Sequence, residues 1–467
     1  MDRIDLLDAG FLYLESREAP MHVAGVNLLE FPARVNQRKF LARAADSYRS
    51  TTELRKPFAH RVAHGALGRF GPFYWEEDPD LDLDYHVQHS ALPKPGRYRE
   101  LFSLVSRLHS TLLDRSRPLW EVHVIEGLQN RQFAVYTKLH HATIDGVAGV
   151  RLTEGGCSPD REAKIDLSPL SIEAHERYKA EHGRTLATDI APSEFELKAM
   201  AEFFKAQFDT SAHFLGVIKS YAATWLGLGE GLAVPWRHVP HTLMNTQVSS
   251  ARRFVAQSWD IERVRAVSKA ADVTINDVVL AMCSGALRHY LDDQGEHPEH
   301  SLRALVPVSV REKDDFDSPV AISYIIADLG TRHKDPADRL EAIVESTRAG
   351  KEMLSELTSR EASLYATLMQ TPLFIASMMG VADWFPPVST VISNVPGPKQ
   401  QLYWNGAPLL GTYPVSAVFH GFALNITFVS YHGKLDFGII ACRQTVPHVQ
   451  RLIDYLEQSL TELEEIV

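Results

Sequence analysis

The chain has 467 residues, 45% hydrophobic and 23% charged, which is the composition of an ordinary globular protein long enough for two packed lobes. Its formal net charge of −11 argues against a nucleic-acid partner, because binding to phosphates requires basic patches. The three cysteines, Cys157, Cys283 and Cys442, form neither a disulfide framework nor a zinc pattern. We expect them to be small apolar residues in a reducing cytoplasm.

Targeting and membrane signals are weak. The first residues, MDRIDLLDAG, are acidic where a signal peptide needs an apolar run, and no stretch is apolar over the roughly eighteen residues that cross a bilayer. We therefore expect a cytoplasmic protein. Residues 195–236 carry aromatic side chains, from Phe203 to Trp225, at helical spacing. This pattern favours a core helix or a helix between lobes, and the alternative is peripheral attachment to the inner membrane or to a lipid droplet.

Strands and helices alternate in the first third of the chain. Residues 100–113 place their apolar side chains on one face and predict an amphipathic helix. Apolar and polar residues then alternate on both sides of the polar turn at residues 127–131. This alternation predicts an antiparallel hairpin whose second strand ends at His140. Residues 153 to about 182, rich in charge, Ser and Pro, predict a loop or linker.

A second series of elements begins after residue 241. Residues 275–291 and 447–465 predict helices, and residues 302–310 and 320–329 predict strands. Residues 335 to about 379 predict helices that are broken near residues 370–372. Two further strands, 424–431 and 435–442, flank His432-Gly433 and predict a second hairpin.

The most informative segment is HHATIDG, residues 140–146, at the end of the first predicted hairpin. The pattern predicts a strand that delivers His140 and His141 onto a tight loop, with Asp145 anchoring the loop and Gly146 allowing unusual backbone angles. Histidine is the side chain best suited to proton transfer near neutral pH, which favours a catalytic site over a polar surface turn. Neighbouring strand residues point to opposite faces, so we do not expect these histidines to share a metal.

Four further blocks accompany this segment: PLW at 118–120, TINDVV at 274–279, SNVPGP at 393–398 and LDAGFLYLES at 7–16. With them, the chain resembles the bacterial wax ester synthase/acyl-CoA:diacylglycerol acyltransferases, within the HHxxxDG superfamily of CoA-dependent acyltransferases. The resemblance covers nearly the full length, and residues 154–241 carry no matching motif.

The resemblance implies a mixed α/β (α+β) fold of two lobes similar to chloramphenicol acetyltransferase, with mixed sheets and a tunnel between them. We expect a first lobe with the HHxxxDG motif at residues 1–185, a helical linker or crossover at 186–240, and a second lobe at 241–467.

The resemblance also implies catalytic roles. His141 would act as the general base that takes the proton of the attacking hydroxyl group and passes it to the CoA sulfur. His140 would shape the loop, and Asp145 would brace it by pairing with an arginine. The side-chain amide of Asn276 and backbone N–H groups near the histidines are alternative donors to the oxyanion.

Substrate-binding candidates each have a structural alternative. Asn276 and Asp277 lie in the first turn of a predicted helix, where polar side chains also cap free N–H groups. Ser393 and Asn394 belong to a predicted turn, which the resemblance puts near the tunnel and the CoA arm. Trp120 fits packing in the core of the sheet better than contact with a substrate.

The resulting hypothesis is an O-acyltransferase that moves a long-chain acyl group from acyl-CoA to a fatty alcohol or to diacylglycerol. Acyl-CoA is a co-substrate here, and no cofactor is expected. The motif holds neither Ser nor Cys, so we expect direct transfer without an acyl-enzyme. The alternatives are a condensation-type enzyme that uses carrier-bound acyl groups and a non-catalytic lipid-binding protein. The intact motif argues against the latter, because binding alone needs no base.

Overall fold

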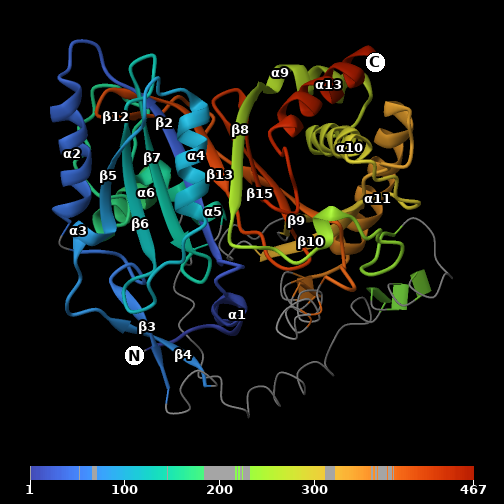
Figure 1. Ribbon diagram of the computed structural model, residues 1–467, viewed down its shortest axis with the longest axis horizontal. Helices are drawn as coiled ribbons and strands as arrows, with labels where there is room; N and C mark the ends of the chain where they lie inside the picture. Colours follow the sequence, from blue (N-terminus) through green and yellow to red (C-terminus); the bar gives the residue numbers. More distant parts are fainter. Residues whose placement is uncertain are drawn as a thin grey trace.

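Two six-stranded mixed sheets form two lobes that lie side by side in the computed structural model (Figure 1). The structure describes residues 2–51, 53–65, 71–144, 146–182, 232–310, 321–358 and 383–466, with short pieces between 216 and 224 and between 361 and 381. The first sheet has the order β12 (Tyr403–Trp404), β13 (Ala407–Val415), β2 (His22–Glu30), β7 (Gln132–His140), β6 (Trp120–Glu126) and β5 (Val87–Ala91). The second sheet has the order β10 (Ala321–Asp328), β9 (Arg303–Val310), β11 (Thr390–Pro396), β14 (Leu424–Tyr431), β15 (Lys434–Cys442) and β8 (Arg252–Asp260).

A small third sheet and the helices complete the lobes. The third sheet has the order β1 (Asp2–Arg3), β4 (Phe73–Glu77) and β3 (His60–His64). The helices before residue 183 are α1 (Leu6–Leu14), α2 (Gln37–Arg49), α3 (Leu83–His86), α4 (Tyr98–His109), α5 (Gly146–Gly155) and α6 (Ile172–His182). Those after residue 240 are η3 (Leu243–Asn245), α9 (Ile261–Ala270), α10 (Ile275–Asp293), α11 (Pro336–Ser355) and α13 (Arg451–Glu465).

Helix α4 confirms the predicted amphipathic helix and lies between the two lobes (Figure 1). Ser106 Oγ accepts a hydrogen bond from the backbone N–H of Phe254 at 2.9 Å, and Ser110 Oγ, at the end of the helix, accepts one from Arg252 at the same distance. Both donors belong to β8, the edge strand of the second sheet. Since an edge strand leaves N–H groups without a neighbour, the serines satisfy these groups and fix one lobe against the other.

Helix α10 runs through the second lobe and confirms the helix predicted there. Every residue from Asp277 to Leu287 is buried, and α9, α11 and α13 pack around it. A helix that is apolar on all sides is stable only when it is surrounded in this way. In the part of the chain that the structure describes, no single helix is long and apolar enough to span a membrane, although α9 and α10, bent by 104°, meet that test together by length and composition.

The lobes are interlocked by β13, which leaves the C-terminal part of the chain to join the first sheet. It pairs antiparallel with β2, from Leu409 opposite Leu29 to Val415 opposite Ala24. The backbone N–H of Thr412 donates a hydrogen bond at 2.8 Å to Asp436 on β15, and burial raises the pKa of this carboxyl group to about 6. The predicted second lobe at 241–467 included residues 403–415. In the structure these residues instead form β12 and β13 of the first sheet. Pairing between strands this distant in sequence leaves no local pattern.

Two predictions of local structure are wrong. The segment at 153–182 is not a continuous loop, because α5 extends to Gly155 and α6 spans Ile172–His182. Most of its charged residues are divided between the loop at 156–171 and α6, which is exposed along one side. The SNVPGP block is not a turn throughout, because its first four residues belong to β11 and pair in parallel with β14. The predicted linker at 186–240 lies outside the described residues, apart from its last residues and short pieces between 216 and 224. The aromatic side chains from Phe203 to Trp225 and the predicted helix break at 370–372 also lie outside them.

Candidate active site

The HHATIDG segment lies where β7 leaves the first sheet. His140 is the last residue of β7 and is paired with His22 on β2. The backbone N–H of Thr143 then donates to the carbonyl oxygen of His140 at 2.9 Å, which closes a tight turn before α5 begins at Gly146. The predicted strand and turn are confirmed. Asp145 lies outside the described residues, so its bracing role stays a prediction.

His140 is buried and points away from solvent. Its Nδ1 accepts a hydrogen bond from the backbone N–H of Ala142 at 3.1 Å, so the ring proton belongs on Nε2. Nε2 lies 3.4 Å from Oε1 of Glu15, an ion-pair distance rather than a formed hydrogen bond. Burial raises the pKa of Glu15, but His140 and Arg115 lower it more, so this pKa lies below its ordinary value. A buried carboxylate therefore faces the first histidine.

His141 is half-buried and contacts a different environment. Its backbone N–H donates to the carbonyl oxygen of Met21 at 2.9 Å. Its ring stacks on Phe11 of α1, with ring centroids 4.0 Å apart and an angle of 11° between the planes. The two neighbouring histidines, one ending β7 and one in the turn, are thus held by different partners.

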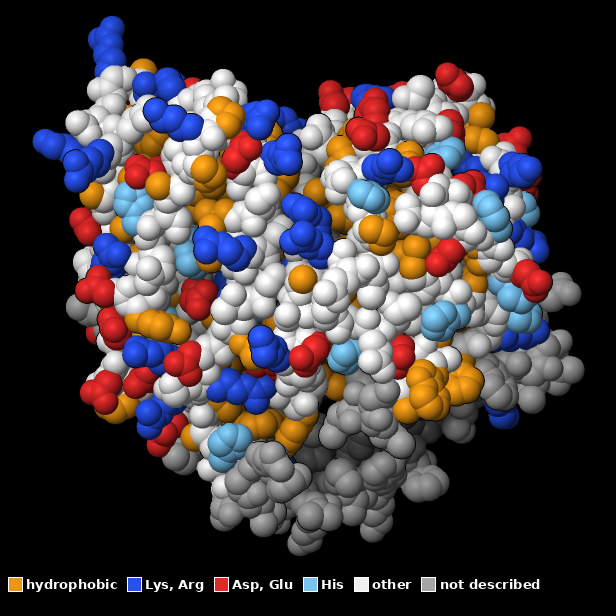
Figure 2. Space-filling view, viewed as in Figure 1, with side chains coloured by type: hydrophobic (Ala, Val, Ile, Leu, Met, Phe, Trp, Pro, Cys, Tyr) orange, Lys and Arg blue, Asp and Glu red, His pale blue; other side chains and the backbone are white. Residues whose placement is uncertain are grey.

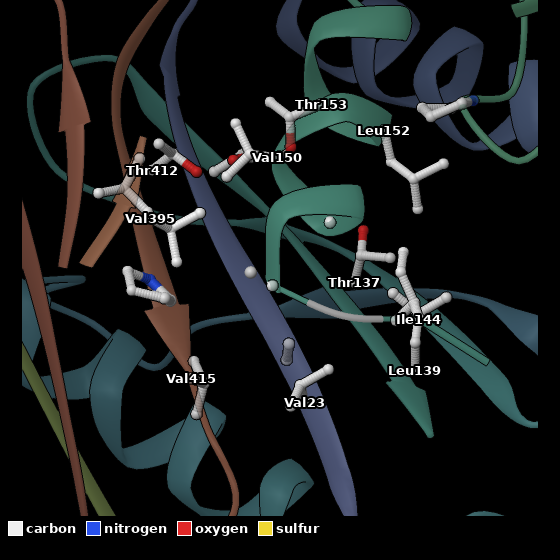
Figure 3. Close-up of a pocket in the computed structure, with 18 of the residues that line it drawn as sticks. Val23, Thr137, Leu139, Ile144, Val150, Leu152, Thr153, Val395, Thr412 and Val415 are labelled. Carbon is white, nitrogen blue, oxygen red and sulfur yellow. Dashed lines mark hydrogen bonds between the residues drawn. The ribbon is translucent and has the colours of Figure 1, made fainter. Parts of the chain in front are cut away.

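A largely apolar cavity opens beside the histidine turn, with about 860 Å³ of empty space that is partly open to solvent. Leu139 and Ile144, on either side of the histidines in sequence, both line it (Figure 3). Figure 3 shows Val23 of β2 and Val150 of α5 pointing into the same space as Val395 of β11. The cavity is therefore built from both sheets, between the lobes, where a tunnel was expected.

Three glycines, Gly25, Gly146 and Gly149, widen this cavity. A Cβ atom at Gly25 or Gly149 would meet nothing within 4 Å, and one at Gly146 would lie 3.4 Å from Val395. Gly146 does not have a positive φ angle, so the expected unusual backbone angle is wrong, and its contribution is the space it leaves.

A second apolar space of about 460 Å³ continues the first. The two share the lining residues Asn27, Tyr48, Thr153 and Pro169. The second reaches Trp404 at the far edge of the first sheet. Together they form an extended apolar volume, which is the shape that a hydrocarbon chain requires.

Neither residue of the polar pair at the start of α10, Asn276 and Asp277, is among those that line this cavity. Asp277 is buried and accepts hydrogen bonds from the backbone N–H and the hydroxyl group of Thr274, at 3.1 and 2.6 Å, and from the hydroxyl of Thr347 at 2.8 Å. These bonds form a capping box, the structural alternative considered for this motif. Asn276 is half-buried and is not among the residues that line the described cavity. Its role as an oxyanion donor stays a prediction.

The other substrate-binding candidates lie at different depths. Trp120 is buried, its indole N–H donates to the carbonyl oxygen of Phe58 at 2.8 Å, and its ring stacks on His86. Ser393 and Asn394 lie on β11, half-buried and exposed respectively, next to Val395, which lines the cavity. Trp120 is thus a core residue, whereas the β11 pair adjoins the cavity.

Sequence reasoning missed the partners of the two histidines. Phe11 and Glu15 belong to the LDAGFLYLES block, which was noticed only as part of the resemblance. Their spacing of four residues indicates one face of a helix, a signal that could have paired them. Nothing local indicated that this face would meet a strand more than 120 residues later.

Two mixed-sheet lobes, with a histidine pair beside an apolar cavity between them, define an acyltransferase of the two-lobed CoA-dependent class. Comparison with known proteins agrees. The profile of the wax ester synthase/diacylglycerol acyltransferase catalytic domain matches residues 4–279, and that of the WS/DGAT C-terminal domain matches residues 321–464. The chain belongs to this family and is an O-acyltransferase.

Individual relatives support this assignment. A Mycobacterium tuberculosis protein, provisionally named a diacylglycerol O-acyltransferase, is 43% identical over 471 residues, covering 99% of each chain. The structure of a wax ester synthase/diacylglycerol acyltransferase from Marinobacter aquaeolei VT8 matches with a TM-score of 0.77 and 37% identity, over 100% of this chain and 99% of that one. The first condensation domain of the CDA synthetase, 16% identical over 100% of this chain and 95% of that one, shares the fold alone, with a TM-score of 0.56.

Proposed function

We propose that this protein transfers a long-chain acyl group from acyl-CoA to the hydroxyl group of a fatty alcohol or of diacylglycerol, with His141 as the general base. The observation that carries the proposal is the position of the histidine turn beside an extended apolar cavity. The imidazole removes the hydroxyl proton as the oxygen attacks the thioester carbon, and returns it to the departing sulfur. General base catalysis of this kind contributes a factor of roughly 10² to 10⁴ in rate.

Direct transfer, without an acyl-enzyme, is part of the proposal. The only hydroxyl side chain in the motif, that of Thr143, donates to the carbonyl oxygen of His140 at 2.7 Å. Burial raises the pKa of Cys157 and of Cys283 to about 12, so both remain thiols at neutral pH. Burial also raises the pKa of Cys442, but hydrogen bonds, among them those from Ser249, outweigh burial and lower it to about 7. Cys442 ends β15 and is not among the residues that line the two described cavities. A thiol is a much weaker nucleophile than a thiolate, and this supports a single-step mechanism.

The test supplies purified protein with palmitoyl-CoA and either hexadecanol or diacylglycerol, and measures both released thiol and ester. We expect equal amounts of thiol and ester and, with acyl-CoA alone, no increase in intact protein mass. Thiol without ester would identify a thioesterase, and a stable acyl adduct would refute direct transfer. Ester formed only from carrier-bound acyl groups would identify a condensation-type enzyme.

We further propose that the protein takes these substrates from a lipid surface. Trp384 and Phe385 are 67% and 71% exposed, the highest values among the large hydrophobic side chains that the structure describes. Their loop is held by Trp236, whose backbone and indole N–H groups donate to Pro387 and Phe385 at 3.1 and 3.0 Å. Exposed aromatic side chains insert at lipid interfaces. On the face in Figure 2 both acidic and basic side chains occur over each lobe, so apolar contact is favoured over charge as the source of binding.

Flotation with neutral phosphatidylcholine vesicles tests this proposal. The double variant Trp384→Ser, Phe385→Ser should float several-fold less than the wild type and keep its melting temperature. Tyr98→Ser, an exposed aromatic residue on α4, is the matched control and should float normally. Undiminished flotation of the double variant would refute this surface.

A further inference from the structure

Helix α1 brings two side chains, one helical turn apart, against the two histidines. Phe11 stacks on the ring of His141, and the carboxylate of Glu15 lies 3.4 Å from Nε2 of His140. The backbone N–H of Glu15 donates to the carbonyl oxygen of Phe11 at 3.1 Å, so the helical turn continues through both residues. Side chains four residues apart lie on the same helix face. One rigid face therefore contacts both rings of the motif.

Glu15 also ties together the backbone around the histidines. Its Oε1 accepts a hydrogen bond from the N–H of Met21 at 3.1 Å, and the carbonyl oxygen of Met21 accepts one from His141 at 2.9 Å. Its Oε2 accepts from Nε of Arg115 at 3.0 Å, and Arg115 also donates to the carbonyl oxygen of Leu12 at 2.6 Å. Both carboxylate oxygens are engaged, and the group is buried, so the network fixes its geometry.

We propose that Phe11 and Glu15 are positioning residues for acyl transfer. Phe11 fixes the plane of the His141 ring, and Glu15 fixes the turn through His140 and Met21. Neither touches the reacting atoms. The inference rests on the proposed function of His141 as the base. It adds that the first helix, more than 120 residues away in sequence, sets the direction in which this base acts.

The physical reason lies in the geometry that proton transfer requires. A general base acts only when its nitrogen lies within hydrogen-bond reach of the proton it removes. An imidazole ring turns about two side-chain bonds, and a stacked neighbour with planes 11° apart restricts the second of them. Misplacement of a reacting group by about 1 Å can cost roughly a hundredfold in rate. Loss of a positioning residue should therefore lower kcat and leave KM nearly unchanged.

The first test compares Phe11→Leu with Phe11→Tyr. Leucine keeps the apolar contact and loses the flat ring, whereas tyrosine keeps the ring. We expect kcat to fall about tenfold or more in Phe11→Leu, with KM within twofold of the wild type, and to stay near normal in Phe11→Tyr. Equal kcat values for the two variants, or a change in KM alone, would overturn the role of Phe11.

The second test compares Glu15→Gln with a matched control, Glu121→Gln. Glu121 is a mostly buried carboxylate on β6 that forms an ion pair with Lys138. It is not part of the network that joins Glu15, Met21 and His141. We expect kcat to fall about tenfold or more in Glu15→Gln, and Glu121→Gln to lose stability with kcat preserved. Equal loss of kcat in both variants would show a general loss of stability and refute the inference.

A measurement without turnover separates this inference from the proposed function. The Cε1–H resonance of His141, identified by its absence in His141→Ala, should carry a ring-current shift from Phe11. We expect the shift to disappear in Phe11→Leu and to persist in Phe11→Tyr. An unchanged resonance in Phe11→Leu would overturn the stacking role even in an active enzyme. A wild type that forms no ester would refute the proposed function and leave this test of the contact intact.

Discussion

Helices α5 and α10 each begin at a motif with polar residues, and the two lobes use these helices in opposite ways. In α5, a Cβ atom at Gly149 would meet nothing within 4 Å, and the residue lines the cavity. In α10, a Cβ atom at Gly285 would come within 2.9 Å of the Cβ of Ser459 on α13. The first helix leaves room for a ligand, whereas the second fills the core of its lobe.

The polar residues of the two motifs differ in the same sense. The turn that carries the histidines adjoins the cavity through Leu139 and Ile144, while Asp277 in the first turn of α10 is surrounded by hydrogen-bond donors. Similar residue types therefore serve a ligand site in one lobe and helix stability in the other. What decides between these roles is the packing around the helix. Variants of His141, Asp277 and Gly149 each test one side of this contrast.

The largest effect is expected for His141→Ala. Removal of the general base should lower kcat by a factor of roughly 10² to 10⁴ and leave the melting temperature close to that of the wild type. Steady-state kinetics with thermal unfolding measures both. His140→Ala should reduce kcat less, and the reverse order would make His140 the base.

Asp277→Asn should give the opposite result. Loss of the carboxylate disturbs a buried capping box and its bond to Thr347, so the free energy of unfolding should fall by about 1–3 kcal/mol. Denaturant titration measures this loss, and kcat should be preserved. A fall in kcat without any loss of stability would place Asp277 in the reaction and remove the contrast between the helices.

Gly149→Leu should change the preference for acyl chain length. The new side chain enters the open cavity, so the ratio of kcat/KM for palmitoyl-CoA to that for octanoyl-CoA should fall by about tenfold. Gly285→Leu is the control, because it should destabilise the fold without altering this ratio. An unchanged ratio in Gly149→Leu would show that acyl chains bind elsewhere.

The last prediction concerns a buried histidine of the first lobe, His109, whose effect is confined to acidic pH. Burial, and then the charge of Lys138, lower the pKa of His109 to about 3. Between pH 6.5 and about 3 the unfolded chain therefore binds a proton that the folded protein does not, and stability falls as the pH falls. His109→Gln should reduce the slope of unfolding free energy against pH in this range by about 1.4 kcal/mol per pH unit. Equal slopes would show that His109 titrates normally in the folded protein.

The sequence by itself determined the elements whose patterns are local. The alternation around residues 127–131, the apolar face of α4 and the turn at His432-Gly433 each follow from neighbouring residues, and all three are confirmed. The HHATIDG segment also identified the end of β7, and the accompanying blocks identified the family. The charge-rich segment at α6 was misjudged, since an exposed helix and a loop share their composition.

Only the tertiary structure decided which of the motif residues meet a cavity. The transfer of β13 into the first sheet, the contact of α1 with the histidines and the capping of α10 by Asp277 depend on residues that lie apart in sequence or on the packing around them. Gly149 and Gly285 both lack a side chain. At Gly149 this leaves open space in the cavity, whereas at Gly285 it allows α13 to pack closely against α10. The physical reason is that the space around a side chain is set by both of the surfaces that pack together. The residues of the second surface lie far away in the sequence, so no local pattern reveals them.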